Sequence, residues 1–340
     1  MPASSTALFK YLKTIGIVNN GDNGRGFANP YDISVSDDGR MFVLNRCDPA
    51  RRKAIRVGVC NLDEEYLYEF GYGFGDGEGQ MVWPVSLTLD RSGRVFVSDE
   101  HNHRISAFDD QGNFLYKWGE NGTGEGQFDG PAGIAIDSNE NLYVSDQKNN
   151  RIQKYTLDGD FISEWGESGT GDGQFNLPWG VAADEDDNVY VADWRNDRVQ
   201  KFDSSGVFIR SYGCDSLGEL SLNRPSGVAV DSRGNVIVAD RGNERVHIYD
   251  NSGTFTGTLR GEATLSKWAE DFFASNPDEM ETRQIAQLVP ELPDHIATPY
   301  HVSSQTEPYF WGPVSVHVDG NDRLYVVETN RHRIQIYDSV

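Results

Sequence analysis

Residues 131–166 read PAGIAIDSNENLYVSDQKNNRIQKYTLDGDFISEWG, and the fold class can be predicted from this segment. Four segments within it alternate apolar and polar residues: GIAID, NLYVSD, RIQKYT and DFISEWG. Turn sequences such as DSNEN and LDGD separate them. Alternation over four to eight residues, bounded by turn residues, is typical of half-buried strands. The stretch therefore predicts four short antiparallel strands.

The same unit recurs along the chain. Prolines that open the unit follow one another at intervals of 47 residues in the middle of the chain, with longer intervals of 54 and 88 at its two ends: Pro30, Pro84, Pro131, Pro178, Pro225 and Pro313. Four strands repeated at this period predict an all-β, six-bladed β-propeller of four-stranded antiparallel blades. The last unit lacks its fourth strand, and residues 8–16 resemble one. We expect this N-terminal strand to complete the last blade and to remove its free edge.

The repeat resembles the NHL repeat family. The family pattern P-x-G-[VI]-A-[VI]-D, followed by V-[AS]-D-x-x-N-x-R-[IV]-Q, is met almost in full by residues 131–153, 178–200 and 225–246. The units at Pro84 and Pro313 match it more loosely, and the unit at Pro30 matches it least. The resemblance implies a single propeller domain over residues 1–340.

Two insertions break the period. Residues 262–309 separate the fifth and sixth units, and TLSKWAEDFF within them places its apolar residues on one helical face. Asn276 and Pro277 read as the cap and first turn of a second helix. The other insertion lengthens a basic loop, NRCDPARRKAI, in the first unit. Both fall on the same predicted rim, so we expect a small helical lid beside a basic loop at one mouth of the channel.

Composition narrows the possible partners. Thirty basic and 53 acidic residues give a net charge of −23, which opposes binding to a nucleic-acid backbone. No apolar run approaches the length of a membrane span, and MPASSTALFKYLK lacks the pattern of a signal peptide. We therefore expect no nucleic-acid or membrane partner and a cytoplasmic location. The three cysteines show no C-x-x-C spacing, and whether Cys47 and Cys60 pair is left open.

Paired acids and arginines recur in five units, at the end of the second strand and the start of the third: Asp99/Arg104, Asp146/Arg151, Asp193/Arg198, Asp240/Arg245 and Glu328/Arg333. An active site rarely needs five equivalent copies. We interpret them as ion pairs that fix the loop between these strands.

Cations and aromatic residues gather at variable positions of the same rim. Guanidinium groups bind carboxylates in a fork, and aromatic rings cover an apolar body, so this combination predicts a site for a small organic anion. The alternative is that exposed loop positions tolerate polar residues and that tryptophans next to proline simply pack. The predicted substrate-binding residues are Arg46, Arg195, Arg224, Arg241, Trp83, Trp179, Trp194, Tyr31, Ser86, Thr88 and His301.

His317 is the most unusual residue of the repeat. Sister units carry Ala135, Ala182, Ala229, Thr88 and Ser34 at its place, and the glycine of P-x-G is replaced by Asp32, Ser86 and Ser315. These departures fall in the last, first and second units, which a closed ring makes neighbours. We predict His317, His101 and Asp32 as catalytic residues, with Asp32 orienting His317 or sharing a metal with it. The metal alternative places a divalent ion, zinc or calcium, on His317 and His101, and a third reading is a buried structural histidine.

Two classes of function follow. The first is a lyase or hydrolase acting on a small anionic organic substrate in the axial pocket, since propellers similar to NHL proteins include amidating lyases with a channel metal, antibiotic lyases and lactonases. No metal histidine of those families matches a position here, so their residues are not carried over. The second is a non-catalytic propeller that binds a protein partner or senses a small ligand.

Overall fold

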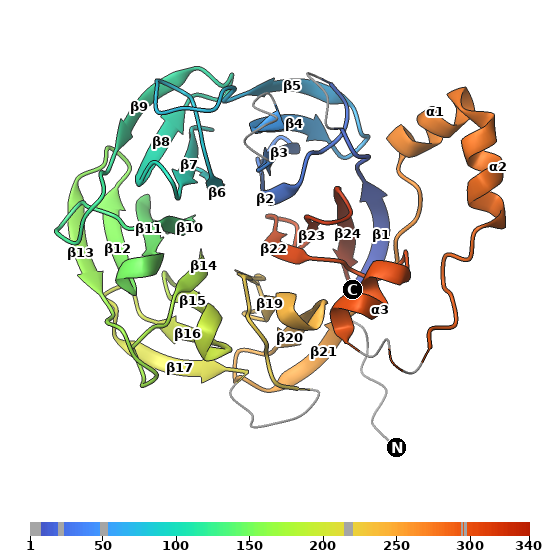
Figure 1. Ribbon diagram of the computed structural model, residues 1–340. Helices are drawn as coiled ribbons and strands as arrows, with labels where there is room; N and C mark the ends of the chain where they lie inside the picture. The colour runs from blue at the N-terminus through green and yellow to red at the C-terminus, as the bar shows by residue number, and fades with distance from the viewer. Residues whose placement is uncertain (1–7, 20–23, 48–53, 214–219, 294, 296–297) are drawn as a thin grey trace.

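The computed structural model describes residues 8–19, 24–47, 54–213, 220–293, 295 and 298–340. Six four-stranded antiparallel sheets surround a central axis as the blades of a propeller (Figure 1). The first blade comprises β2 (Pro30–Val35), β3 (Arg40–Asn45), β4 (Arg56–Asn61) and β5 (Tyr66–Phe70). The second comprises β6 (Pro84–Leu89), β7 (Val95–Asp99), β8 (Arg104–Phe108) and β9 (Phe114–Trp118). The third comprises β10 (Pro131–Ile136), β11 (Asn141–Asp146), β12 (Arg151–Thr156) and β13 (Phe161–Trp165).

The remaining blades repeat this order. The fourth comprises β14 (Pro178–Ala183), β15 (Val189–Asp193), β16 (Arg198–Phe202) and β17 (Phe208–Tyr212). The fifth comprises β18 (Gly227–Val230), β19 (Val236–Asp240), β20 (Arg245–Tyr249) and β21 (Phe255–Leu259). The sixth comprises β22 (Pro313–Val318), β23 (Leu324–Glu328), β24 (Arg333–Ser339) and β1 (Phe9–Ile15).

The N-terminal strand closes the ring as predicted. β1 pairs antiparallel with β24, from Phe9 opposite Ser339 to Ile15 opposite Ile334. The two ends of the chain therefore share one sheet, and the last blade has no unpaired third strand. Apolar side chains that alternate along the strands form cores between successive blades. Tyr143 of the third blade, for example, packs in one cluster with Phe202 of the fourth.

The predicted ion pairs are confirmed in four of the five blades. Nε of the arginine lies 2.7–2.9 Å from the acid in Asp146/Arg151, Asp193/Arg198, Asp240/Arg245 and Glu328/Arg333. In the second blade Arg104 instead donates to carbonyl oxygens of Asp76, Gly77 and Gln80. In each case the arginine fixes a connection at the blade's edge.

A second set of contacts joins the second to sixth blades each to the blade that follows it in the ring. The residue before each of these arginines has a positive φ, and its side chain accepts the N–H of the residue before the next blade's proline. The acceptors are His103, Asn150, Asp197, Glu244 and His332, and the donors are Gly130, Leu177, Arg224, Gly312 and Asn29. The bond from Asn29 N to His332 Nδ1, 2.9 Å long, joins the last blade to the first.

The insertion is helical but does not cover the channel. Its helices are α1 (Lys267–Ser275), α2 (Pro277–Ile285) and α3 (Pro299–Gln305). Figure 1 shows α1 and α2 outside the ring, beside the seam between the last and first blades. Trp268 is buried there against Phe27 and donates from Nε1 to the carbonyl oxygen of Glu64, 2.5 Å away. The prediction of a lid over the channel is therefore wrong. The insertion packs against the outside of the ring instead, because its largest apolar side chain, Trp268, is buried at this seam.

Other expectations concern the first blade and the whole chain. Cys47 and Cys60 are both buried free thiols, so they do not pair with each other. Residues 48–53 of the predicted basic loop, which include Arg51, Arg52 and Lys53, lie outside the described residues. No helix in the described part of the chain is both long and apolar enough to cross a membrane.

Candidate functional site

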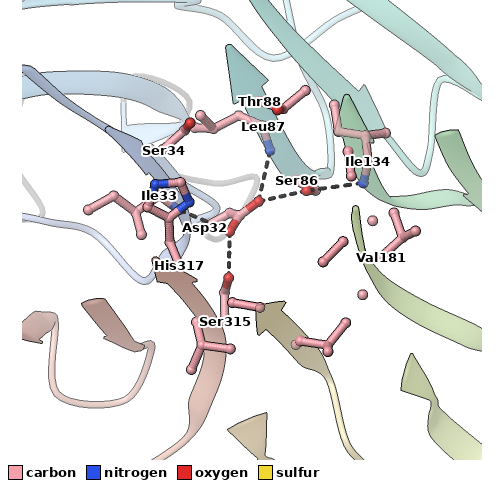
Figure 2. A pocket seen from close by; sticks show the side chains of 18 of the residues that line it. Asp32, Ile33, Ser34, Ser86, Leu87, Thr88, Ile134, Val181, Ser315 and His317 are labelled. Carbon is pink, nitrogen blue, oxygen red and sulfur yellow. Dashed lines mark hydrogen bonds between the residues drawn. The ribbon is translucent and has the colours of Figure 1, made fainter. Parts of the chain in front are cut away.

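The six inner strands enclose a cavity on the propeller axis (Figure 2). Its volume is about 200 Å³, and a drug-sized ligand needs roughly 300–1,000 Å³. The cavity is therefore suited to a smaller molecule. All inner strands begin at the same rim of the ring, which we call the proline rim after Pro30, Pro84, Pro131, Pro178, Pro225 and Pro313.

Equivalent positions of the inner strands form two layers of the cavity wall. The Asp32 layer, nearer the proline rim, contains Asp32, Ser86, Gly133, Gly180, Gly227 and Ser315. The His317 layer, two residues further along each strand, contains Ser34, Thr88, Ala135, Ala182, Ala229 and His317. In both layers the polar members come from the last, first and second blades, so the polar sector predicted from the sequence is confirmed.

Asp32 holds three neighbouring blades together. One carboxylate oxygen, Oδ2, accepts from Ser86 Oγ at 2.6 Å and from Leu87 N at 2.9 Å. The other, Oδ1, accepts from Ser315 Oγ at 2.5 Å and from its neighbour Ile33 N at 3.0 Å. Burial raises the pKa of Asp32, although these hydrogen bonds oppose the shift. With four donors around it, this carboxylate acts as a structural link between strands.

The third, fourth and fifth blades have glycine at the positions that Asp32, Ser86 and Ser315 occupy in the other three blades. A Cβ on Gly133 would lie 2.4 Å from the carbonyl oxygen of Trp179, and one on Gly180 would lie 2.7 Å from that of Ser226. The backbones of adjacent inner strands therefore approach each other directly in the third, fourth and fifth blades. In the other three blades, side-chain hydrogen bonds take the place of this close approach.

His317 is a neutral residue of the cavity wall. Its Nε2 accepts a hydrogen bond from Val35 N at 3.3 Å, which places the ring proton on Nδ1. Burial lowers the pKa of His317 to about 4, and the nearby Asp319 opposes this shift only in part. The ring is therefore uncharged at neutral pH and presents an N–H donor. Contrary to our prediction, Asp32 does not orient His317. The imidazole accepts from Val35 N, and the Asp32 carboxylate accepts from the hydroxyl groups of Ser86 and Ser315.

The mouth of the cavity is bridged by aromatic rings. Tyr31 of the first blade and Trp179 of the fourth, on opposite sides of the ring, have centroids 6.5 Å apart. Trp179 in turn contacts Trp194, in the short helix η3 (Trp194–Asn196), at 5.5 Å. The guanidinium groups of Arg195 and Arg224 lie 5.3 and 5.4 Å from the Trp194 ring. These contacts place arginine charge at the edge of an aromatic surface.

A second arginine site extends this surface towards the second blade. Arg46 lies between the rings of Tyr31, at 4.7 Å, and Trp83, at 5.2 Å. It also forms an ion pair of 3.0 Å with Glu100. This acid was not predicted, because only cations and aromatic residues of the rim were considered for an anion site. We call the combined surface the mouth cluster, which comprises Tyr31, Arg46, Trp83, Trp179, Trp194, Arg195 and Arg224.

The other predicted site residues lie apart from the cavity. His101 is exposed and contacts Trp83 at the proline rim, whereas His317 lies at the level of Thr88, four residues or roughly 13 Å further along the strands. Arg241 lies in η4 (Arg241–Asn243), beside α3. His301 is on α3 itself, where it bonds Thr298. These three residues do not line the cavity.

The described residues do not fit the predicted metal. No group of three or more histidine, cysteine or carboxylate side chains converges within the described ranges. His317 and His101 lie at different levels, and the carboxylate of Asp32 already accepts four hydrogen bonds. We therefore derive no chemical step through a metal.

Comparison with known proteins agrees with this architecture. A family model described as a 6-bladed beta-propeller matches residues 82–166, and the NHL repeat model matches residues 175–202, 222–249 and 310–337. The chain therefore contains NHL repeats and folds as a six-bladed β-propeller. Its curated relatives include NHL repeat-containing protein 3 from Mus musculus and from Homo sapiens, 36% and 38% identical over 112 residues. The alignment covers 33% of this chain and 31% of each relative, so the chain matches about a third of their length.

Solved structures share the fold at low sequence identity. A streptogramin B lyase has a TM-score of 0.58 at 14% identity and covers 98% of both chains. Virginiamycin B lyase from Staphylococcus aureus has a TM-score of 0.57 at 16% identity, covering 98% of this chain and 100% of that one. A protein of unknown function from Bacteroides thetaiotaomicron has a TM-score of 0.60 at 17% identity, covering 95% and 73%. At these identities the likeness concerns the fold alone.

Proposed function

We propose that the protein binds a small organic anion at the mouth cluster, with part of the ligand reaching into the axial cavity. The observation that carries this proposal is the pair Arg195 and Arg224 on the ring of Trp194. Both arginines are exposed, and neither has a carboxylate within ion-pair distance among the described residues. On a chain of net charge −23, two unpaired guanidinium groups at a cavity mouth favour an anionic ligand.

The aromatic members of the cluster would hold the body of the ligand. Trp179 and Tyr31 are half-buried and meet over the cavity, so an apolar group bound on them lies next to the axis. Arg46 contributes less charge, because Glu100 neutralises it. The expected ligand thus has its anionic group near Trp194 and its uncharged part towards the cavity.

Calorimetric titration with benzoate and its neutral analogue benzamide would test the proposal. Removing both charges in an Arg195→Met, Arg224→Met double variant should weaken benzoate binding about tenfold or more, since charge-assisted hydrogen bonds contribute about 1.5–3 kcal/mol each. Benzamide binding should change by less than about threefold. Arg91→Met, which removes an exposed arginine of the β6–β7 turn, is the matched control. Equal benzoate affinity in the double variant and the control would contradict the proposal.

A lyase or hydrolase activity is the second candidate. It is favoured by the position of His317 in the cavity wall and by the shared fold with virginiamycin B lyase. Because His317 is neutral and its Nε2 is occupied, its chemical role would be donation from Nδ1 to a developing oxyanion rather than general-base catalysis. Turnover of a panel of esters, lactones and cyclic depsipeptides that is lost in His317→Gln would support this candidate. Absence of turnover would leave a non-catalytic ligand sensor or a scaffold for a protein partner.

A cytoplasmic location belongs to the same proposal. It is supported by the buried free thiols of Cys47 and Cys60, which are typical of a reducing compartment. Fractionation of cells that express the full chain would test it, and recovery of the protein outside the cytoplasm would contradict it.

A further inference from the structure

Three polar side-chain atoms of the His317 layer have no hydrogen-bond partner among the described residues. Ser34 Oγ, Thr88 Oγ1 and His317 Nδ1 line the cavity, and no hydrogen bond from another described residue reaches these atoms. Figure 2 shows the three side chains on neighbouring strands at one side of the cavity. Ser34 is buried, and Thr88 and His317 are half-buried; polar groups shielded from bulk water are normally hydrogen-bonded. These groups are therefore available to a bound molecule.

We infer that the His317 layer is a binding site for a small neutral group with an acceptor oxygen, such as an amide or ketone carbonyl. His317 supplies an N–H donor whose direction is fixed by the Val35 N–H on the other ring nitrogen. Ser34 and Thr88 add two hydroxyl groups from the adjacent strands, each able to donate. This inference rests on the part of the proposed function that places a ligand in the cavity.

The charge of the cavity wall favours a neutral group. Asp32 is its single charged lining residue, and no lysine or arginine lines the cavity among the described residues. A carboxylate group in the cavity would face the Asp32 charge without a cation to offset it. A cation would face the N–H of His317, and Asp32 has no free acceptor to offer because four donors surround it. A carbonyl oxygen carries no net charge and can accept from the His317 N–H, so neither the Asp32 charge nor this N–H disfavours it.

The opposite side of the same layer sets the shape of the ligand. Ala135, Ala182 and Ala229 face the polar residues across the axis, so the group bound to His317 would place its apolar side against three methyl groups. A cavity of about 200 Å³ accommodates a carbonyl with a short apolar substituent. Acetamide is a suitable probe, and acetate is its anionic analogue of nearly equal size.

The test uses full-length protein labelled with ¹⁵N in histidine. The imidazole signals are recorded while acetamide or acetate is added, and His317→Gln identifies the signal of His317. Acetamide should shift this signal, and acetate at the same concentration should not. Thr88→Val, which replaces a hydroxyl by a methyl group of similar size, should weaken acetamide binding about 3–10-fold, the effect of one hydrogen bond of about 0.5–1.5 kcal/mol. Thr88→Ser keeps the hydroxyl and should stay within about twofold of the parent.

The outcomes separate this inference from the proposed mouth site. An equal shift with acetate, no shift with acetamide, or unchanged affinity in Thr88→Val would each overturn the inference. The Arg195→Met, Arg224→Met double variant should bind acetamide like the parent. If the benzoate experiment fails while the acetamide result holds, the mouth site alone is wrong.

Discussion

An Asp32→Ala substitution should destabilise the propeller at its closing sector. The change removes the acceptor of Leu87 N, Ile33 N and two serine hydroxyls. Each buried donor left without an acceptor costs about 1–3 kcal/mol, and the relief of burying a carboxylate offsets part of this cost. We expect a net loss of about 2–4 kcal/mol at neutral pH. For a chain of this length that corresponds to a fall in Tm of roughly 3–6 °C.

Differential scanning calorimetry would measure this loss, with Asp158→Ala as the control because the Asp158 side chain is 83% exposed. The cost of Asp32→Ala should also depend on pH. Since the folded-state pKa of Asp32 is raised, its contribution to stability is fully present below the ordinary pKa of an aspartate and declines as the pH rises through the folded-state value. The difference in stability between parent and variant should therefore be larger in acid than at pH 7. A fall in Tm no greater than that of the control, or a difference that grows with pH, would refute this account of Asp32.

Three further predictions concern other parts of the molecule. His332→Leu removes the acceptor of Asn29 N and should cost about 1–3 kcal/mol in urea unfolding. His332→Asn, which introduces the residue type that the third blade has at this position, should cost less than half as much; equal costs would contradict the proposed role of the bond between the last and first blades. Trp268→Ala should lower stability by about 3–5 kcal/mol and make α1 susceptible to limited proteolysis, while Phe272→Ala, at a side chain 44% exposed, should do neither. The imidazole of His317 should remain neutral in NMR titrations from pH 8 down to pH 5, since its pKa is about 4; protonation near pH 6.5 would show that burial does not control it.

The fold could be predicted because each blade repeats the same local pattern. Alternation along residues 131–166 defines four strands, and the recurring prolines define how many times they occur. Closure by residues 8–16 could also be predicted, because the last unit lacks a strand that the N-terminal segment resembles. These are local or periodic signals, and they need no knowledge of three-dimensional contacts.

The position of the helical insertion could not be predicted in the same way. The sequence predicts that residues 262–309 leave the ring at one rim and that part of them is helical. Whether the helices fold over the channel or against the outside depends on where Trp268 finds an apolar site. That site is formed by Phe27 and the turn at Glu64, more than 200 residues earlier in the chain.

The candidate site was predicted in its location but only partly in its roles. Unusual residues at two positions of the repeat identified the polar sector correctly. Their roles depend on contacts between blades: Asp32 is bonded to residues 54 and 283 positions away, whereas the side-chain hydroxyls of Thr88 and Ser34 have no hydrogen-bond partner in the described part of the chain. Both layers line the cavity, and the pattern of a single repeat does not show which layer is hydrogen-bonded within the protein and which has polar atoms left for a ligand.

We propose that the two layers of the cavity wall differ in role: the Asp32 layer holds the blades together and the His317 layer binds a ligand. The most direct test measures unfolding free energy and acetamide affinity for Ser86→Ala and Thr88→Val, two substitutions two residues apart on β6. We predict that Ser86→Ala loses about 1–3 kcal/mol of stability and binds acetamide like the parent, while Thr88→Val keeps its stability and binds about 3–10-fold more weakly. If both variants lose stability and affinity together, or if the two effects are exchanged, the division of the cavity into a structural layer and a binding layer is wrong.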